Sequence, residues 1–331
     1  MPMQVAVIGG GSWGTTVAHL CAKNTPTTLW ARREDVCEEI RKEHRNSRYL
    51  EGYDLTPTLD ATSSLEDAVR AADVLVMGVP SHGMRETAKE LAPFLRPWVP
   101  VVSLSKGLEQ GSRLRMTQVL EQELPGHPCG VLTGPNLAKE ILAGDAAASV
   151  IAMDDPVIAE ALQDVFACDA FRVYTNPDVI GCEVAGALKN VMAIASGMAD
   201  GLGTGDNTRA AVITRGLAEL TRLGCAMGGH PMTFAGLAGM GDLIATCISP
   251  QSRNRYVGEQ LGQGRTIDEV IAEMNMVAEG VKSSAVVMEL AHEHGVVMPI
   301  ARQVYNVCHH GRTAHEAYDG LVQRAEISRR E

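Results

Sequence analysis

The first fourteen residues constrain this chain more than any other stretch. The apolar run 5–8 leads directly into Gly9, Gly11 and Gly14, which follow the spacing GxGxxG. After a strand, such glycines permit a tight turn, a close approach of the backbone to a pyrophosphate, and close packing of the next helix, whose first N–H groups face the phosphates. The same glycines also occur in ordinary strand-to-helix turns. Their position after a β-type run favours a dinucleotide site.

Composition limits the class of protein. With 331 residues the chain is long enough for two domains, and 29 Lys+Arg against 40 Asp+Glu give a net charge of -11, which argues against a nucleic-acid or anionic membrane surface. The eight cysteines form no CxxC pair, and the start lacks the basic region of a secretory signal. Lys189 and Asn190 interrupt the most apolar stretch, 184–198, so no transmembrane span is expected. We therefore expect a cytoplasmic protein with reduced thiols.

The pattern of elements changes near residue 180. The first half alternates β-branched runs with helical segments, which is typical of a parallel sheet with crossover helices. Strands are predicted at 3–8, 27–31, 73–79, 100–104, 129–133, 148–153 and 171–174, and helices at 12–23, 34–45, 64–70, 83–92, 112–122, 137–142 and 156–166. The second half predicts helices only, near 178–198, 206–223, 233–245, 252–261, 266–272, 279–294, 299–308 and 313–320. The predicted fold is a Rossmann-type α/β domain with a mostly parallel sheet (1–180), followed by an all-α domain (181–331).

Two arginines bear on the choice of dinucleotide. Arg32 and Arg33 follow the second predicted strand, where a residue usually contacts the ribose. Guanidinium groups suit a 2′-phosphate and favour NADP, whereas an acidic residue would favour NAD. The alternative is that both arginines solvate a helix start, and Glu34 and Asp35 close behind weaken the preference.

Three loops follow predicted strands, at the sheet edge where ligands of open α/β folds bind. They are 78–81, 103–107 and 133–138, and the second carries Lys106. A lysine at the tip of a buried strand is costly unless it meets an anion. The alternative readings are ordinary turns and a lysine that reaches solvent.

Lys189 is the candidate proton donor. Its predicted helix is apolar around nearly its whole circumference, so the lysine loses hydration and its pKa falls toward neutrality. A second lysine in the same pocket, Lys106, would lower that pKa further, and Asn190 could orient a hydroxyl. The alternative is a lysine that reaches solvent at the domain surface.

Two later motifs suit a small phosphorylated substrate. Asp242 lies between glycines and an apolar run, where it could pair with a pocket lysine or cap a helix. The run 252–255, Ser-Arg-Asn-Arg, combines a hydroxyl, two cations and an amide at a helix start, which suits a phosphate monoester or simply a basic surface turn. The remaining histidines lack metal-ligand spacing, since His292 and His294 cannot share a helix face, so no metal site is predicted.

Taken together, the motifs resemble the bacterial type of NAD(P)-dependent glycerol-3-phosphate dehydrogenase. The matching stretches follow the family's order over nearly the whole chain: 9–14, 79–81, 105–109, 134–140, 187–190, 239–243, 252–255 and 277–281. A serine is common in the family where Asn136 stands, and polar or basic residues are common where Ile248 and Tyr256 stand. None of these departures removes a group that the chemistry requires.

The resemblance implies a role for each matching residue. Lys189 would be the proton donor and acceptor. The substrate would contact Lys106, Gly134, Asn136, Lys189, Asp242, Ser252, Arg253 and Asn254. The cofactor would contact Gly9, Gly11, Ser12, Trp13, Gly14, Arg32, Arg33, Tyr49, Lys106, Ala138, Arg253, Val277 and Glu279.

The implied reaction is the reversible reduction of dihydroxyacetone phosphate to sn-glycerol 3-phosphate with NADP, or NAD, as the hydride carrier. It would supply glycerophospholipid synthesis, and a homodimer is expected from the family. A related dehydrogenase of a hydroxyacid or nucleotide sugar is a second hypothesis, although it does not explain the Ser-Arg-Asn cluster. A third is a non-catalytic NADP-binding redox sensor, which would have no need of a buried Lys189.

Overall fold

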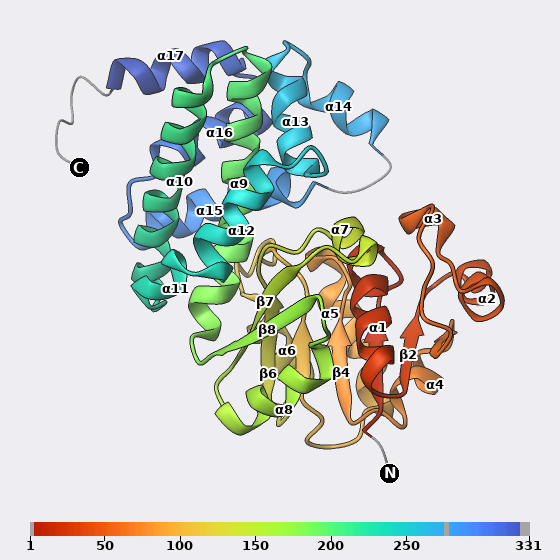
Figure 1. The fold of residues 1–331 in the computed structure, drawn as a ribbon. Coiled ribbons are helices and arrows are strands. Elements are labelled where there is room, and N and C mark those ends of the chain that lie inside the picture. Colours follow the sequence, from red (N-terminus) through yellow and green to blue (C-terminus); the bar gives the residue numbers. More distant parts are fainter. Residues whose placement is uncertain (1–2, 275–277, 325–331) are drawn as a thin grey trace. The chain divides into compact units, whose positions relative to one another are not determined.

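The computed structural model describes residues 3–274 and 278–324, which form two compact units (Figure 1). One unit comprises Met1–Ser105 and Leu114–Val179, and the other comprises Lys106–Arg113 and Ile180–Glu331. We call them the sheet unit and the helical unit. The short segment 106–113 belongs to the helical unit although a strand of the sheet unit ends shortly before it, at Ser103, and this placement was not predicted.

The sheet unit contains eight strands in the order β3-β2-β1-β4-β5-β6-β7-β8. All neighbouring pairs are parallel except β6 and β7, which are antiparallel. The mostly parallel sheet and the helical second half confirm the predicted fold class. The strands are β1 (Val5–Ile8), β2 (Thr27–Trp30), β3 (Leu59–Thr62), β4 (Val74–Met77), β5 (Val101–Ser103), β6 (Cys129–Thr133), β7 (Ala147–Met153) and β8 (Phe171–Asn176).

The uninterrupted apolar run of β1 has a structural reason. Val5 and Val7 join one buried cluster, whereas Ala6 and Ile8 join another, so both faces of the strand are covered by apolar side chains. The α-helices that surround the sheet are α1 (Ser12–Asn24), α2 (Glu34–Glu43), α3 (Ser47–Leu50), α4 (Leu65–Val69), α5 (Met84–Leu91), α6 (Met116–Glu123), α7 (Ala138–Ala143) and α8 (Pro156–Phe166).

Two short elements of this unit were not predicted. In β3 only Leu59 and Ala61 are buried, and they alternate with the exposed Asp60 and the half-buried Thr62. Two apolar residues in an edge strand of four give almost no periodic signal, and the strand forms because β2 supplies its hydrogen-bond partners. The one-turn helix α3 is likewise too short to leave a periodic pattern.

The helical unit is built around α9 (Val179–Gly201), most of whose side chains are buried. By length and hydropathy α9 could cross a membrane, but 94% of its apolar window is buried inside the protein, as in the core helix of a globular unit. The other α-helices are α10 (Asp206–Ala226), α11 (Pro231–Ala235), α12 (Asp242–Ile248), α13 (Arg253–Gly262), α14 (Ile267–Glu273), α15 (Glu279–Glu293), α16 (Pro299–His309) and α17 (Ala314–Arg324).

The single helix predicted over 233–245 is wrong. The chain forms α11, a π-helical turn at Leu237–Gly241, and then α12. Gly236 adopts an extended conformation that ends α11. Gly239 then packs so closely on Phe234 that a Cβ atom would lie 2.2 Å from the Phe234 carbonyl oxygen. The apolar period continues through this break, so the sequence pattern hides it.

A buried carboxylate makes the stability of the helical unit depend on pH. Glu219 on α10 is 3% exposed and accepts hydrogen bonds from the N–H groups of Ile300 (2.8 Å) and Ala301 (3.2 Å), at the start of α16. Burial raises the pKa of Glu219 from 4.5 to about 7, although the two N–H groups oppose the shift. Between these pH values the folded protein holds a proton that the unfolded chain has released.

We therefore expect the Glu219 contribution to stability to be complete below pH 4.5 and to be lost as the pH rises through 7, by roughly 3 kcal/mol. Glu219→Gln mimics the protonated group, so its melting temperature should fall less between pH 5 and pH 8 than that of the wild type. Glu289→Gln, at an exposed position of α15, serves as the control. Equal pH dependences in the wild type and Glu219→Gln would contradict this assignment.

Candidate active site

Glycines bring α9 and α13 into backbone contact. A Cβ atom at Gly197 of α9 would lie 2.0 Å from the Arg255 carbonyl oxygen, and one at Gly258 of α13 would lie 2.0 Å from the Ile194 carbonyl oxygen. Only glycine permits so close an approach at these positions. The crossing places the start of α13 beside the middle of α9, where Lys189 and Asn190 lie.

Lys189, Asp242 and Lys106 form one ion cluster within the helical unit. The Lys189 ammonium donates to Asp242 Oδ1 at 2.5 Å, and the Lys106 ammonium donates to Asp242 Oδ2 at 2.8 Å. The side chains of Lys189 and Asp242 are 7% and 2% exposed, and that of Lys106 is 16% exposed. The single carboxylate thus bridges two lysines, and the fully charged cluster carries a net charge of +1. Such a cluster attracts an anionic ligand.

Thr246 completes the surroundings of Lys189. Its hydroxyl donates to the Asp242 carbonyl oxygen at 2.6 Å and accepts from the Lys189 ammonium at 2.6 Å. An ammonium has three hydrogens, and in the described residues the third hydrogen of Lys189 has no partner. Thr246 was not among the predicted site residues. It lies four residues after Asp242 on α12, so helical spacing from the predicted aspartate could have identified it.

The environment prepares Lys189 to exchange a proton. Burial lowers the pKa of Lys189 to about 8, the carboxylate of Asp242 opposes the shift, and the like charge of Lys106 adds to it. The expected effects of the apolar helix and of a second lysine in the same pocket are both present. A group with this pKa gives up and takes back a proton readily near neutral pH.

A chain of amides holds this cluster in place. Asn190 donates to the Lys106 carbonyl oxygen at 2.8 Å and accepts from Asn254 at 3.0 Å, and Asn254 accepts from the Gly280 N–H at 2.9 Å. Asn190 thereby fixes the segment 106–113 on α9. Its carboxamide was expected to orient a hydroxyl, but its oxygen and one hydrogen are committed to the framework.

The start of α13 presents polar groups in an arrangement open to an anion. The Ser252 hydroxyl caps the helix by accepting from the Arg255 N–H, and no acidic residue occupies the first turn. Arg253 is exposed, and its charge interacts with that of Glu279. Arg255 differs from its predicted role as a second cation of this site, because its guanidinium pairs with Asp200 at 2.8 Å and with Glu259.

The glycine-rich turn of the sheet unit fits a dinucleotide pyrophosphate. Gly9 adopts φ +126°, and a Cβ atom on Gly14 would lie 2.0 Å from the Gly9 carbonyl oxygen. Around Gly11 there is open space where a Cβ atom would lie. Helix α1 begins with neither a side-chain cap nor an acidic residue in its first turn, and the Trp13 indole N–H is buried without a partner. These features leave donors for an anion at the start of α1.

The other predicted cofactor residues of the sheet unit have different surroundings. Arg33 is exposed and pairs with Asp35 at 2.6 Å. For Arg33, this agrees with the alternative that the two arginines solvate a helix start. Arg32 is exposed and makes no hydrogen bond or ion pair with any described residue. The Tyr49 carbonyl oxygen accepts from the Ser12 hydroxyl at 3.1 Å. Ala138 is the first residue of α7.

Two predicted substrate residues, Gly134 and Asn136, also lie in the sheet unit. Gly134 follows β6 with φ +143°, and Asn136 accepts from the Ser149 hydroxyl at 3.1 Å. The proposed Lys106, Lys189, Asp242, Ser252, Arg253, Asn254 and Glu279 belong to the helical unit. Val277 lies outside the described residues.

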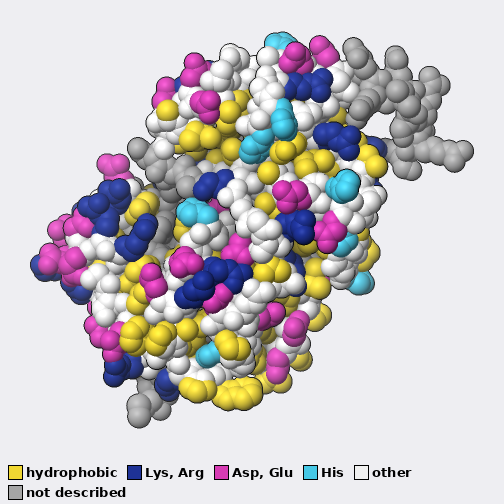
Figure 2. Space-filling view, turned by 180° about the vertical axis from the view of Figure 1, so that it is seen from behind, with side chains coloured by type: hydrophobic (Ala, Val, Ile, Leu, Met, Phe, Trp, Pro, Cys, Tyr) yellow, Lys and Arg dark blue, Asp and Glu magenta, His cyan; other side chains and the backbone are white. Residues whose placement is uncertain are grey.

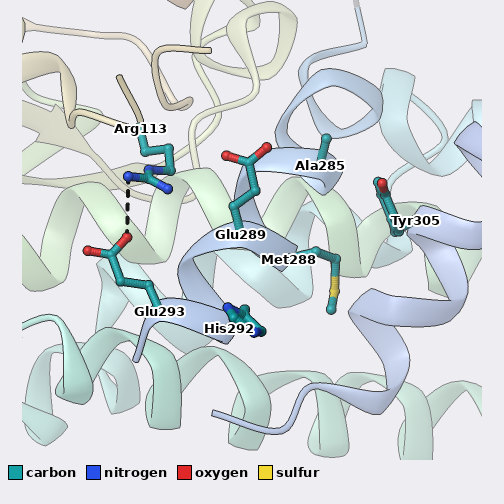
Figure 3. A pocket seen from close by; sticks show the side chains of 7 residues that line it. All are labelled: Arg113, Ala285, Met288, Glu289, His292, Glu293 and Tyr305. Carbon is teal, nitrogen blue, oxygen red and sulfur yellow. Dashed lines mark ion pairs between the residues drawn. The ribbon is translucent and has the colours of Figure 1, made fainter. Parts of the chain in front are cut away.

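A shallow cavity of about 580 Å³ lies elsewhere on the helical unit (Figure 3). It contains none of the predicted site residues and is lined by Arg113, Ala285, Met288, Glu289, His292, Glu293 and Tyr305. Its single arginine pairs with Glu293 at 3.6 Å, and Glu289 adds a second carboxylate, so the cavity does not suit a phosphate. Among residues 3–274 and 278–324, no group of His, Cys, Asp or Glu side chains is arranged to hold a metal ion.

On the face shown in Figure 2, the charged side chains of the described residues do not gather into a basic patch. Figure 2 shows acidic and basic side chains mixed over the visible face of the molecule. With a net charge of -11, binding of an anionic substrate depends on a local group of cations. The Lys106–Lys189 cluster is such a group.

Comparison with known proteins agrees with these features. The family model for the NAD-dependent glycerol-3-phosphate dehydrogenase N-terminus matches residues 4–159, and that for the C-terminus matches residues 178–319. A glycerol-3-phosphate dehydrogenase (NAD(P)+) 2 of Sphingopyxis alaskensis is 59% identical over 323 residues, which cover 98% of this chain and 97% of that protein. A glycerol-3-phosphate dehydrogenase (NAD(P)+) of Mycobacterium avium is 59% identical over 321 residues, covering 96% and 94%.

A solved structure agrees as well. The crystal structure of glycerol-3-phosphate dehydrogenase from Coxiella burnetii superposes with a TM-score of 0.92 at 36% identity, covering 97% of this chain and 99% of that one. Both halves of the chain match the same family, at high identity and over nearly their full length. The chain belongs to the NAD-dependent glycerol-3-phosphate dehydrogenase family.

Proposed function

We propose that this protein reduces dihydroxyacetone phosphate to sn-glycerol 3-phosphate, reversibly, with Lys189 as the proton donor and acceptor. The observation that carries the proposal is the buried Lys189 ammonium, which is held by Asp242 and Thr246 and has a pKa of about 8. A carbonyl that becomes an alcohol needs one proton, and this group supplies it at neutral pH.

The residues at the start of α1 would hold the cofactor. Gly9, Gly11 and Gly14 shape the turn, the N–H groups of the first helical turn would face the pyrophosphate, and Ser12 and Trp13 lie in that helical turn. When bound, the nicotinamide cofactor supplies or accepts the hydride. Since Arg32 is exposed and has no partner in the described chain, we propose that it favours the 2′-phosphate of NADP over NAD.

The helical unit would supply the acid–base chemistry. In the reduction, Lys189 gives its proton to the oxygen on the substrate's second carbon and becomes a neutral amine. Asp242 stabilises the ammonium before transfer and fixes its direction, while Lys106 offsets negative charge that develops on that oxygen. In the reverse reaction the neutral amine takes the hydroxyl proton.

The substrate phosphate would bind at the start of α13. The helix dipole, the Ser252 hydroxyl, the Arg253 guanidinium and the second amide hydrogen of Asn254 all favour a dianion there. Gly134 and Asn136 are proposed as further contacts on the substrate. With the phosphate at the start of α13, the ion cluster would contact the carbonyl end of the substrate.

We further propose a homodimer that acts in the cytoplasm and supplies glycerophospholipid synthesis, as the family resemblance implies. A related hydroxyacid dehydrogenase remains the second candidate for the activity, because it would use the same turn and a basic side chain. The start of α13, which has a serine cap and no acidic residue in its first turn, favours a phosphorylated substrate instead. A redox sensor without turnover would not require an ammonium aligned by two partners.

The pH dependence of the rate tests the role of Lys189. Reduction needs the ammonium, so its kcat should fall above pH 8, about tenfold per pH unit, whereas oxidation needs the amine and should rise with pH until about 8. The measurement is NADPH absorbance, with dihydroxyacetone phosphate for the reduction and with NADP and glycerol 3-phosphate for the oxidation, and NADH is used for comparison. Lys282→Ala, at an exposed lysine of α15, should keep the wild-type profile. If dihydroxyacetone phosphate causes no oxidation of either NADPH or NADH, the proposed reaction is refuted.

A further inference from the structure

Asn46 is a fully buried polar residue that no part of the proposed mechanism uses. It lies between α2 and α3 in the sheet unit and has no exposed surface. An asparagine carboxamide placed entirely among protein atoms is costly unless its polar groups find partners. The partners that it finds belong to the glycine-rich turn.

Both donor bonds of the Asn46 side chain reach this turn and its helix. The amide nitrogen donates to the Gly10 carbonyl oxygen at 3.0 Å and to the Thr15 hydroxyl at 2.9 Å. The Asn46 amide oxygen is buried without a partner. The opposite orientation of the amide would set that oxygen against the Gly10 carbonyl oxygen, so the two donor bonds fix the side chain as it is.

The backbone of Asn46 extends the connection to Tyr49. The Asn46 carbonyl oxygen accepts from the N–H groups of Tyr49 (3.2 Å) and Leu50 (2.8 Å), and the Ser12 hydroxyl donates to the Tyr49 carbonyl oxygen at 3.1 Å. These bonds close a ring that runs from Gly10 through Asn46 and Tyr49 back to Ser12. We call this ring the turn clamp. Ser12 and Tyr49 are proposed cofactor contacts, and Asn46 joins them to the turn.

We propose that Asn46 is a positioning residue for dinucleotide binding: it sets the Gly10–Ser12 turn and Tyr49 in their mutual places before the cofactor arrives. This inference deepens the proposed function and rests on the dinucleotide site within it. Within the turn the Gly11 carbonyl oxygen accepts from the Thr15 N–H of α1, whereas the Gly10 carbonyl oxygen is held by Asn46 from outside the turn. A turn that must be ordered at the moment of binding costs affinity, whereas a clamped turn is already ordered.

The test is Asn46→Ala in the full-length protein. We expect the dissociation constant and the KM for NADPH to rise at least tenfold, with kcat at saturating NADPH and the KM for dihydroxyacetone phosphate within twofold of wild type. Titration calorimetry with NADPH alone gives the binding constant without turnover. If the wild type binds NADPH but does not reduce dihydroxyacetone phosphate, the proposed reaction fails while this inference is still tested.

Two neighbouring threonines give a matched pair in case Asn46→Ala does not fold. Thr15→Val removes one acceptor of the Asn46 amide, whereas Thr16→Val removes a hydroxyl that bonds only within α1, to the Ser12 carbonyl oxygen. We expect Thr15→Val to weaken NADPH binding severalfold and Thr16→Val to leave it unchanged. The inference is overturned if folded Asn46→Ala binds NADPH within twofold of wild type, or if the two threonine variants bind it equally well.

Discussion

Replacement of Lys189 by methionine is expected to lower kcat for dihydroxyacetone phosphate reduction by about 10²–10⁴, the usual contribution of a positioned proton donor. Methionine fills a similar volume without a charge, so Asp242 keeps Lys106 as its partner and no buried carboxylate is left alone. Steady-state rates at saturating NADPH and substrate measure the change. Lys189→Ala should show the same loss.

Two observations separate this effect from misfolding. Lys189 is not among the proposed cofactor contacts, and the glycine-rich turn belongs to the sheet unit, so NADPH binding to Lys189→Met should match that of the wild type. The pH dependence of any residual reduction should no longer show the fall above pH 8. A variant that turns over at a rate comparable to wild type would refute the proton-transfer role and leave the identity of the substrate open to the other tests.

Removal of the Asp242 carboxylate is expected to have the largest effect on stability. In Asp242→Asn the ammonium groups of Lys189 and Lys106 lose the anion that lies between them, and the buried Lys189 loses the group that keeps its pKa up. Breaking a buried pair in this way costs about 3–5 kcal/mol. We expect a melting temperature lower by roughly 10 °C at pH 7, together with loss of activity, since Lys189 also loses its orientation.

A double variant tests the electrostatic cause. If repulsion and an unpaired charge are responsible, Asp242→Asn combined with Lys189→Met should recover much of the stability that Asp242→Asn loses, although activity stays low. Thermal unfolding of the wild type, both single variants and the double variant completes the cycle. Additive losses in the double variant would contradict an electrostatic coupling between Asp242 and Lys189 as the cause.

Local sequence patterns predicted most elements of the fold. The apolar run of β1, the glycines after it and the apolar circumference of α9 each leave a strong signal within a few turns or strand residues. The failures were elements whose existence depends on neighbours. β3 has two buried residues and is completed by pairing with β2, and the break before α12 arises from close packing of Gly239 on Phe234.

In the candidate site, too, some features were predicted from local sequence and others depend on distant neighbours. The sequence by itself determined the glycine-rich turn and the burial of Lys189, because close backbone packing demands glycine and an apolar helix demands a core. Only the tertiary structure decided that Asp242 bridges Lys189, 53 residues away, and Lys106, 136 residues away. The tertiary structure also determined that Arg255 pairs with Asp200 and that the Asn46 amide donates to the Gly10 carbonyl oxygen. Hydrogen-bond partners so distant along the chain have no common period, and only the packing of helices and strands brings them together.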